Sequence, residues 1–373
     1  QTTGAYCDIL FREEERMKKW KKFLVLALSG VMIAMALTGC GSSSEKSDSD
    51  AKVEDVSTRT VYVSPQWVNA AQNGKVKGYK NVKVFEVTYT GKLKDSKSYK
   101  KGHVPGAMLI GDTDVEDAVG SQEEPYNLLK PEVIEANLLK HGITKDTKVV
   151  LYGEDPSGVA RVAYGMIYDG VEDVKVLNGG LDAWKDAGYD TETDVNKAKA
   201  ATDFGVAVPA HPEYWTSMTD AKAKLQSDSN FKLVSIRSKA EWLGKTSGYS
   251  YIDRAGEPEG AVWGKGADSA ADVNGYMKDG KVVDLKTLQN GLWKDVDFTM
   301  DNHLAFYCGT GWRACVPFLI CYQEGMDNIS VYDGGWYEWQ MYGDNPVQVG
   351  DPASDNCQHT TVSQLPTDKA AKN

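Results

Sequence analysis

The sequence predicts an α/β protein with two tandem domains, each a mostly parallel sheet that carries helices on both faces. Its 373 residues are enough for two domains, and its 41% hydrophobic and 25% charged residues are ordinary for a globular chain. Short apolar runs alternate with helical stretches, which is the pattern of a parallel sheet covered on both sides. Short blocks also recur at a nearly constant distance: Tyr152 and Tyr307 are 155 residues apart, and so are Gly179 and Gly334. The chain therefore contains two copies of one fold.

The first copy is predicted over residues 57–190. Apolar runs predict its strands, and two residues mark helix ends: Pro131 suits a first helical turn, and Gly188 closes a short helix. The strands are expected at residues 82–87, 149–152 and 174–177, and the helices at residues 131–141, 157–168 and 181–187.

The second copy is predicted over residues 212–347, after a linker at residues 191–211 that is rich in Thr, Asp, Ala and Lys. Residues 348–373 are polar and are expected to form a mobile tail. Within the second copy, strands are expected at residues 232–236 and 304–307, and helices at residues 218–225 and 314–324.

Cys308 is the candidate nucleophile, because it stands where a predicted strand leads into a predicted helix. Loop amides and a helix N-terminus favour negative charge, and they can shift a thiol with a pKa near ~8.5 toward the thiolate. Gly309 and Gly311 let backbone N–H groups turn inward around an anion, and Arg313 supplies a fixed cation. A buried structural cysteine is the alternative. The two glycines, the arginine and the strand-to-helix setting together favour catalysis.

The residues Cys308-Gly309-Thr310-Gly311-Trp312-Arg313 resemble the active loop of the rhodaneses, the family of thiosulfate and 3-mercaptopyruvate sulfurtransferases. Residues 102–107 (Gly-His-Val-Pro-Gly-Ala) and residues 177–184 resemble other landmarks of this family, so the resemblance covers both copies. It implies two tandem rhodanese-like domains and a cysteine that carries one extra sulfur. Related phosphatases and arsenate reductases use a loop that is one residue longer.

The repeat indicates that only the second copy is catalytic. Gly153 and Gly158 stand 155 residues before Cys308 and Arg313, with Glu154 between them, so the first copy lacks both the nucleophile and the cation. His103 lies in this inactive copy, and we interpret it as a structural histidine.

Two further arginines are candidates for substrate binding. Arg237 stands at the carboxyl end of the strand predicted at residues 232–236, the edge where open parallel sheets bind ligands. Ser235 occupies a position where the family commonly has an aspartate, which leaves the ordering of Arg237 open. The resemblance places Arg254 near the active loop. The full set of predicted substrate-binding residues is Arg313, Arg237, Gly309, Thr310, Gly311, Trp312 and Arg254.

The resemblance implies transfer in two half-reactions, which divides one difficult step into two easier ones. The Cys308 thiolate takes the outer sulfur of a small anionic donor, while Arg313 and Arg237 hold the oxygens of the leaving group. A thiol or cyanide then removes that sulfur. No metal or organic cofactor is required, and no C-x2-C pair suggests a zinc site. Arg313 favours thiosulfate as the donor. Three alternatives stay open: a 3-mercaptopyruvate sulfurtransferase, a phosphatase or arsenate reductase, and a non-catalytic surface lipoprotein that binds an anion or a partner.

The N-terminal region predicts export. Residues 17–40 read as a signal peptide, with a basic start and an apolar run at residues 23–37. This segment ends in Leu-Thr-Gly-Cys, which resembles the lipobox of bacterial lipoproteins and implies that Cys40 is lipidated. We expect residues 41–56 to be a disordered tether and residues 1–16 to lie upstream of the natural start. The expected location is the extracytoplasmic face of a bacterial membrane, with the lipid on Cys40 as the anchor.

Net charge and cysteine count bound the remaining partners. A net charge of −11 argues against nucleic acid, because the phosphate backbone would be repelled. An oxidising compartment could pair Cys308 with Cys315 or Cys357, but we expect Cys308 to be a free thiol. The oligomeric state and the physiological acceptor stay open.

Overall fold

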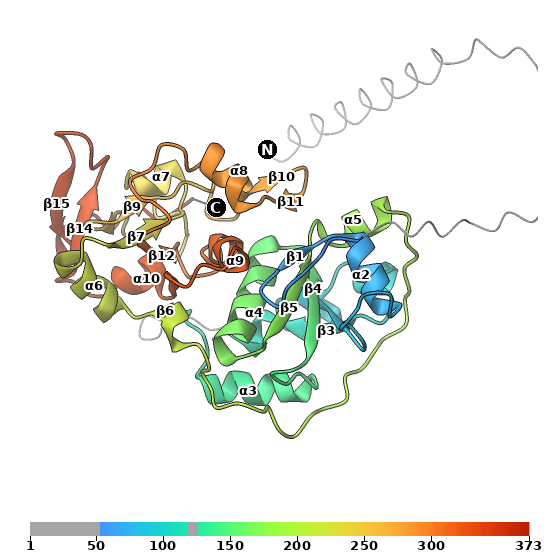
Figure 1. The fold of residues 1–373 in the computed structure, drawn as a ribbon. Helices are drawn as coiled ribbons and strands as arrows, with labels where there is room; N and C mark the ends of the chain where they lie inside the picture. The colour runs from blue at the N-terminus through green and yellow to red at the C-terminus, as the bar shows by residue number, and fades with distance from the viewer. Residues whose placement is uncertain (1–52, 118–125, 373) are drawn as a thin grey trace, which may run out of the picture. The chain divides into compact units, whose positions relative to one another are not determined.

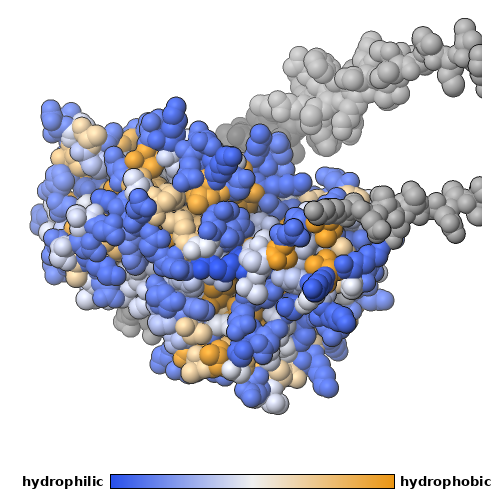
Figure 2. All heavy atoms as spheres, viewed as in Figure 1, coloured by the Kyte–Doolittle hydropathy of each residue, from blue (hydrophilic) through white to orange (hydrophobic). Residues whose placement is uncertain are grey.

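The computed structural model describes residues 53–117 and 126–372 (Figure 1). The predicted upstream segment, the signal peptide and Cys40 fall outside these residues, as does most of the tether, so export and lipidation stay predictions. None of the helices in the described part is long and apolar enough to cross a membrane. Hydrophilic residues cover most of the face shown in Figure 2.

The first domain is built on a five-stranded sheet whose paired strands are all parallel, in the order β1-β5-β4-β2-β3. Neighbouring residues of β4 face opposite sides: Val149 and Leu151 join one apolar core, and Val150 joins another. The strands are β1 (Tyr62–Val63), β2 (Lys83–Thr88), β3 (Met108–Gly111), β4 (Lys148–Gly153) and β5 (Asp173–Leu177), and the helices are α2 (Pro65–Gln72), α3 (Pro131–Lys140), α4 (Pro156–Asp169) and α5 (Gly180–Asp186).

The second domain repeats this sheet strand for strand, in the order β6-β13-β12-β7-β9 with parallel pairing. This confirms the predicted pair of α/β domains. The strands are β6 (Trp215–Thr216), β7 (Phe231–Ser235), β9 (Val262–Trp263), β12 (His303–Tyr307) and β13 (Ile329–Tyr332), and the helices are α6 (Met218–Ser227), α7 (Lys239–Trp242), α8 (Leu285–Asn290), α9 (Cys315–Gln323) and α10 (Gly335–Trp339).

Two small antiparallel sheets and several 3₁₀ turns complete the described chain. The elements are the hairpin β10 (Met277–Lys278) with β11 (Lys281–Val282), the sheet β15 (Gln358–Thr361), β14 (Pro346–Val349) and β8 (Glu257–Pro258), and the turns Leu93–Asp95, Tyr99–Lys101, Asp112–Asp114, Pro212–Tyr214, Asn274–Tyr276 and Val362–Gln364.

The expectation of a mobile tail at residues 348–373 is wrong for the residues that the structure describes. Strand β14 crosses the predicted boundary and pairs with both β8 and β15. Val362 is 1% exposed and Leu365 is 6% exposed. These apolar side chains are buried against the second domain, which offsets the entropy cost of ordering a polar segment.

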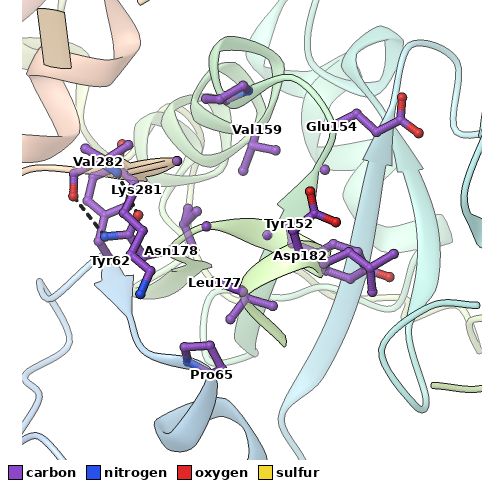
Figure 3. A pocket seen from close by; sticks show the side chains of 18 of the residues that line it. Tyr62, Pro65, Tyr152, Glu154, Val159, Leu177, Asn178, Asp182, Lys281 and Val282 are labelled. Atoms are coloured by element: carbon purple, nitrogen blue, oxygen red, sulfur yellow. Dashed lines mark hydrogen bonds between the residues drawn. The ribbon is translucent and has the colours of Figure 1, made fainter. Parts of the chain in front are cut away.

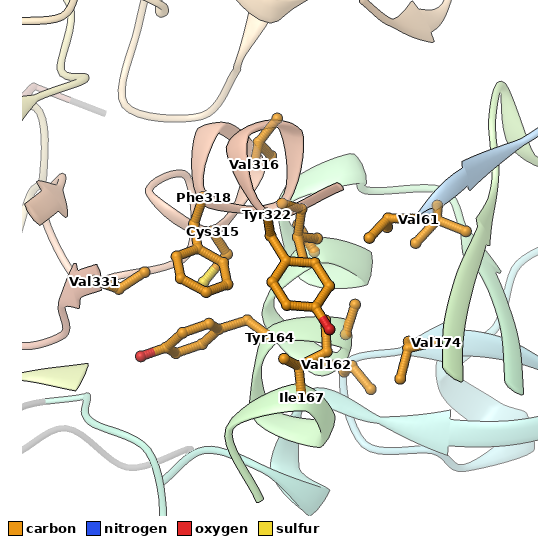
Figure 4. Close-up of a cluster of buried hydrophobic side chains, with 14 of the residues drawn as sticks. Val61, Val162, Tyr164, Ile167, Val174, Cys315, Val316, Phe318, Tyr322 and Val331 are labelled. Atoms are coloured by element: carbon orange, nitrogen blue, oxygen red, sulfur yellow. The ribbon is translucent and has the colours of Figure 1, made fainter. Parts of the chain in front are cut away.

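Helices α4 and α9 pack against each other and join the two domains. Figure 4 shows Tyr164 of α4 beside Phe318 of α9, and their ring centroids are 5.0 Å apart with the planes nearly perpendicular. Buried residues of both domains belong to one continuous apolar cluster, which also includes Val162 and Val316. The two sheets are therefore held in one packed body, and their carboxyl edges can contribute to shared sites.

Candidate active site

The loop of residues 308–313 connects the carboxyl end of β12 to α9, as the sequence predicts. Backbone bonds fix its start: the Cys308 carbonyl accepts from Trp336 N at 2.9 Å, and the Gly309 carbonyl accepts from Tyr337 N at 2.9 Å. Both donors lie in α10, so the loop is tied to the next crossover helix. Cys308 is 1% exposed and has no disulfide.

Close packing explains the two glycines of the loop. A Cβ at Gly309 would collide with the ring of Tyr249. Gly311 has φ of +88°, and a Cβ there would lie 2.7 Å from the Asp333 carbonyl oxygen. Only glycine fits both positions without displacing these neighbours.

Arg313 is nearly buried, and its terminal nitrogens are already bound by protein atoms. Its Nη1 and Nη2 donate to the two oxygens of Glu241 at 3.1 and 2.9 Å. They also donate to the Ser269 carbonyl at 2.9 Å and to the Tyr249 hydroxyl at 3.1 Å. Arg313 therefore contacts the cavity as a neutralised ion pair, not as an unpaired cation.

Arg237 lies behind this pair, fully buried, and is not among the residues that line the cavity. Its donors reach Glu241 at 3.2 Å, Glu257 at 2.8 Å, and the carbonyls of Gly256 and Ser247. The family commonly has an aspartate at the position of Ser235. In this chain, Glu241 and Glu257 are the carboxylates that order Arg237. Burial disfavours the charged form of Glu241, but Arg313 and Arg237 outweigh it and lower its pKa to about 2.

Arg254 also does not line the cavity. Its carbonyl accepts from the indole of Trp336 at 2.8 Å, and its Nε is buried. The structure thus brings Cys308, Thr310, Trp312 and Arg313 together at one cavity and leaves the two other arginines outside it.

This cavity, of about 260 Å³, lies between the two domains. Its lining includes five aromatic side chains and two carboxylates, and five of the thirteen lining residues belong to the first domain. The lining residues are Tyr89, Glu116, Tyr126, Asp155, Ser157, Tyr249, Tyr251, Ala270, Ala271, Cys308, Thr310, Trp312 and Arg313. The sequence did not indicate the contribution of the first domain. Tyr249 and Tyr251 could have been found, because they lie in the stretch that the resemblance places near the active loop.

Several cavity residues have shifted pKa values, Tyr249 and Glu116 among them. Burial raises the pKa of Tyr249 to about 12, although Arg313 opposes the shift, so the phenol is neutral near pH 7. Burial also raises the pKa of Glu116 to about 7, against the lowering effect of Arg161. Glu116 accepts from the indole of Trp312.

The C-terminal segment binds the chain that carries the cavity tyrosines. Ser247 N donates to the Lys369 carbonyl at 2.8 Å, and Lys369 N donates to the Asp253 carbonyl at 2.9 Å. Ala371 N donates to the Tyr249 carbonyl at 3.0 Å. A segment expected to be mobile thus supports one wall of the cavity.

A larger cavity, of about 860 Å³, lies at the carboxyl ends of the first domain's strands (Figure 3). It contains Gly153, where a Cβ would lie 2.8 Å from the Val87 carbonyl, so the fold leaves no room for a cysteine there. The hairpin β10–β11 covers one side through two bonds between Asn178 and the backbone of Val282. The size of this cavity does not make it the candidate active site, because Cys308 lines the smaller one.

Replacing Glu241 by Gln should lower the free energy of unfolding by about 3–5 kcal/mol at pH 7, because it leaves two buried arginines without their shared charge. Urea denaturation measures this. The pKa of Glu241 is lowered from its ordinary 4.5, so its contribution is complete above pH 4.5 and is lost as pH falls toward 2. The wild-type and variant curves should therefore converge in acid. Glu213→Gln, at a half-exposed ion pair, is the control and should change stability little; an equal loss there would contradict the prediction.

Replacing Ala371 by Pro removes the N–H that donates to the Tyr249 carbonyl. One hydrogen bond contributes about 1 kcal/mol, so the segment at Tyr249 should open about fivefold more often. Hydrogen exchange of residues 249–252 measures this opening. Ala371→Ser keeps the N–H and should exchange like wild type; equal exchange in the Pro and Ser variants would refute the role of this bond.

Comparison with known proteins agrees with the fold. The rhodanese-like domain family matches residues 64–187 and 217–342. Thiosulfate sulfurtransferase YnjE of Escherichia coli is 41% identical over 299 residues, which are 79% of this chain and 66% of YnjE. The crystal structure of YnjE superposes with a TM-score of 0.71.

Two other solved structures are similar over a comparable length. EanB in complex with ergothioneine is 33% identical, with a TM-score of 0.72, over 79% of this chain and 71% of EanB. The anaerobic ergothioneine biosynthesis enzyme of Chlorobium limicola, bound to its natural substrate trimethyl histidine, is 34% identical with a TM-score of 0.71, again over 79% and 71%. Two family matches, two matching sheets and the loop at Cys308 together show that this chain belongs to the rhodanese-like domain family.

Proposed function

We propose that the protein is a sulfurtransferase that carries a sulfane sulfur as a persulfide on Cys308, with thiosulfate as the preferred donor. The observation that carries this proposal is the place of Cys308: it follows the central strand β12, starts the loop to α9 and lines the cavity between the two domains. The named activity of YnjE, a thiosulfate sulfurtransferase, supports the same chemistry. Other relatives named thiosulfate/3-mercaptopyruvate sulfurtransferases keep 3-mercaptopyruvate as the alternative donor.

The reaction balances without a further reagent. The Cys308 thiolate attacks the outer sulfur of thiosulfate, a new S–S bond forms, and the old S–S bond breaks as sulfite leaves. An acceptor thiolate or cyanide then attacks the outer sulfur of the persulfide and regenerates the Cys308 thiolate. Charge develops on the sulfur atoms during both steps. The backbone amides of the loop and the Thr310 hydroxyl are the polar groups nearest to Cys308 in the sequence, and we assign the stabilisation of this charge to them.

The buried ion pair redefines the roles of the two arginines in this proposal. Arg313 lines the cavity while it is held by Glu241, so it presents a fixed, partly neutralised guanidinium to the donor. Arg237 acts through Glu241 as a positioning residue and does not touch the substrate. A site with this charge balance should bind thiosulfate weakly.

Incubation with thiosulfate should add one sulfur atom to the peptide that contains Cys308, as measured by mass spectrometry without reductant, and cyanide should remove it. Cys308→Ser should abolish both the gain and the turnover. Cys357→Ser is the matched control, because Cys357 is a partly exposed thiol away from the cavity, and it should behave like wild type. Sulfur transfer that survives in Cys308→Ser would refute the mechanism, and a chain that accepts no sulfur from either donor would favour a non-catalytic binding protein.

A cationic acceptor is the second candidate, and the cavity itself favours it. Arg313 is the one basic side chain among the described residues of the lining, and Glu241 neutralises it. Of the two carboxyl groups in the lining, Glu116 is held by Arg161, and Asp155 supplies the negative charge. Four tyrosines and Trp312 line the same cavity, and aromatic rings attract a quaternary ammonium group. An organic cation is better matched to this lining than a second anion.

The structures of EanB add an independent observation. Their variants change a tyrosine 59 residues before the persulfide cysteine and a threonine two residues after it. Tyr249 and Thr310 stand at the same distances from Cys308. In this reading the outer sulfur of the persulfide bonds to an imidazole carbon of trimethyl histidine, that carbon loses its proton, and the Cys308 thiol is regenerated.

Protein carrying the Cys308 persulfide should convert trimethyl histidine to its thiolated product if the second candidate is right. Asp155→Asn should then raise the KM for trimethyl histidine about fivefold and leave the KM for cyanide unchanged, because only the cation is attracted by the carboxylate. Asparagine also caps helices well, so the start of α4 should be kept. Absence of the thiolated product, with normal transfer to cyanide, would exclude this acceptor.

A further inference from the structure

Arg161 of the first domain is a buried cation that binds a carboxylate from each domain. It is 0% exposed, its Nε donates to Glu116 at 2.7 Å, and its Nη1 lies 2.6 Å from Asp333. Glu116 belongs to the first domain, and Asp333 follows strand β13 of the second. We name these three residues the Arg161 cluster.

The Arg161 cluster lies against the middle of the active loop. A Cβ on Gly311 would be 2.9 Å from the Asp333 carboxylate and 3.0 Å from Arg161 Nη1. The next residue, Trp312, donates its indole N–H to Glu116. Two consecutive loop residues between Cys308 and Arg313 are therefore in contact with charges that the first domain supplies or holds.

The repeat places an equivalent contact on the opposite side of the domain interface, and this contact shows which residues suffice for packing the domains together. Asp333 accepts from Leu128 N at 2.7 Å, and its counterpart 155 residues earlier, Asn178, accepts from Val282 N at 2.8 Å. Each domain thus clasps a backbone segment of the other. At the position of Arg161, the counterpart 155 residues later is Val316.

Arg161 and Asp333, on the side that faces the active loop, are therefore charged, whereas their counterparts Val316 and Asn178 are neutral. Burying three charged groups costs desolvation energy, and replacing such clusters by well-packed neutral residues is often neutral or stabilising. Asparagine and valine meet the structural need at the opposite clasp, so stability does not account for Arg161 and Asp333. The contact of Arg161 and Asp333 with Gly311, together with the contact of Glu116 with Trp312, does.

We propose that the first domain takes part in catalysis through the Arg161 cluster, which positions the active loop so that Cys308 meets its substrate in a reactive geometry. The proposal rests on the sulfur transfer proposed above, and it makes Arg161, Glu116 and Asp333 positioning residues. The domain without a nucleophile then supplies both a wall of the cavity and the support of the loop.

The test is made in the full chain. Two residues of the Arg161 cluster are replaced by their counterparts from the opposite clasp: Arg161→Val and Asp333→Asn. Asparagine can still accept from Leu128, but the double variant leaves the buried Glu116 without its arginine, so the denaturation midpoint should fall and kcat is compared at a temperature where both proteins are folded. The kcat of the double variant for sulfur transfer should fall about 10- to 100-fold, since small misplacement of reacting groups costs that much, while the KM for the donor changes little. Asn178→Ala is the matched control: it breaks the opposite clasp and should leave kcat unchanged.

Alkylation of Cys308 by iodoacetamide, followed by peptide mapping, reports on the loop even if no sulfur is transferred. The rate of Cys308 alkylation should change severalfold in the double variant and should stay at the wild-type value in Asn178→Ala. Glu116→Gln, which keeps size and shape, serves if the double variant does not fold, and it should slow transfer and change alkylation in the same directions. Wild-type kcat and alkylation in these variants would overturn the role of the cluster, whereas failure of wild-type Cys308 to accept sulfur would refute only the proposed function.

Discussion

The packing of α4 against α9 is the contact on which the rest of the site depends. These helices follow the central strands β4 and β12, so their contact sets the distance between the two carboxyl sheet edges. The cavity at Cys308 takes its lining from both domains, and Arg161 reaches Asp333 across the same interface. A small rotation between the domains would open the cavity and, at the same time, separate Arg161 from Asp333. Apolar burial, rather than any single polar bond, therefore maintains the chemistry.

Glu241 illustrates how a buried carboxylate can define an arginine's role. It binds both Arg313 and Arg237 and is itself fully buried, with the capping contact of α7 on its other side. An unpaired Arg313 would make the cavity attractive to any small anion. Because Glu241 binds it, Arg313 has a fixed position at the cavity, and its charge is largely neutralised. The other lining residues, which include Asp155 and Tyr126, then have the larger effect on which molecules the cavity can hold.

The fold and the position of the Cys308 loop could be predicted because their signals are local. Apolar runs marked β4, β5, β7 and β12 within one or two residues, and the 155-residue repeat identified Gly153 as the inactive counterpart of Cys308. The partners of Arg237 could not be predicted in this way, since Glu257 and Gly256 come from another segment of the domain. Tyr89 and Tyr126 reach the cavity only through the domain interface. The tail was misjudged because its polar composition hides two buried residues, Val362 and Leu365.

The bond from Ala371 to Tyr249 gives the site an order of completion during protein synthesis. The first domain and the strand before Cys308 emerge from the ribosome well before residues 369–371. Until those residues arrive, the segment that carries Tyr249 and Tyr251 lacks its backbone partners. A nascent chain can therefore display the thiol loop before the cavity wall around it is finished. The aromatic wall at Tyr249 and Tyr251 is thus completed later than the loop at Cys308.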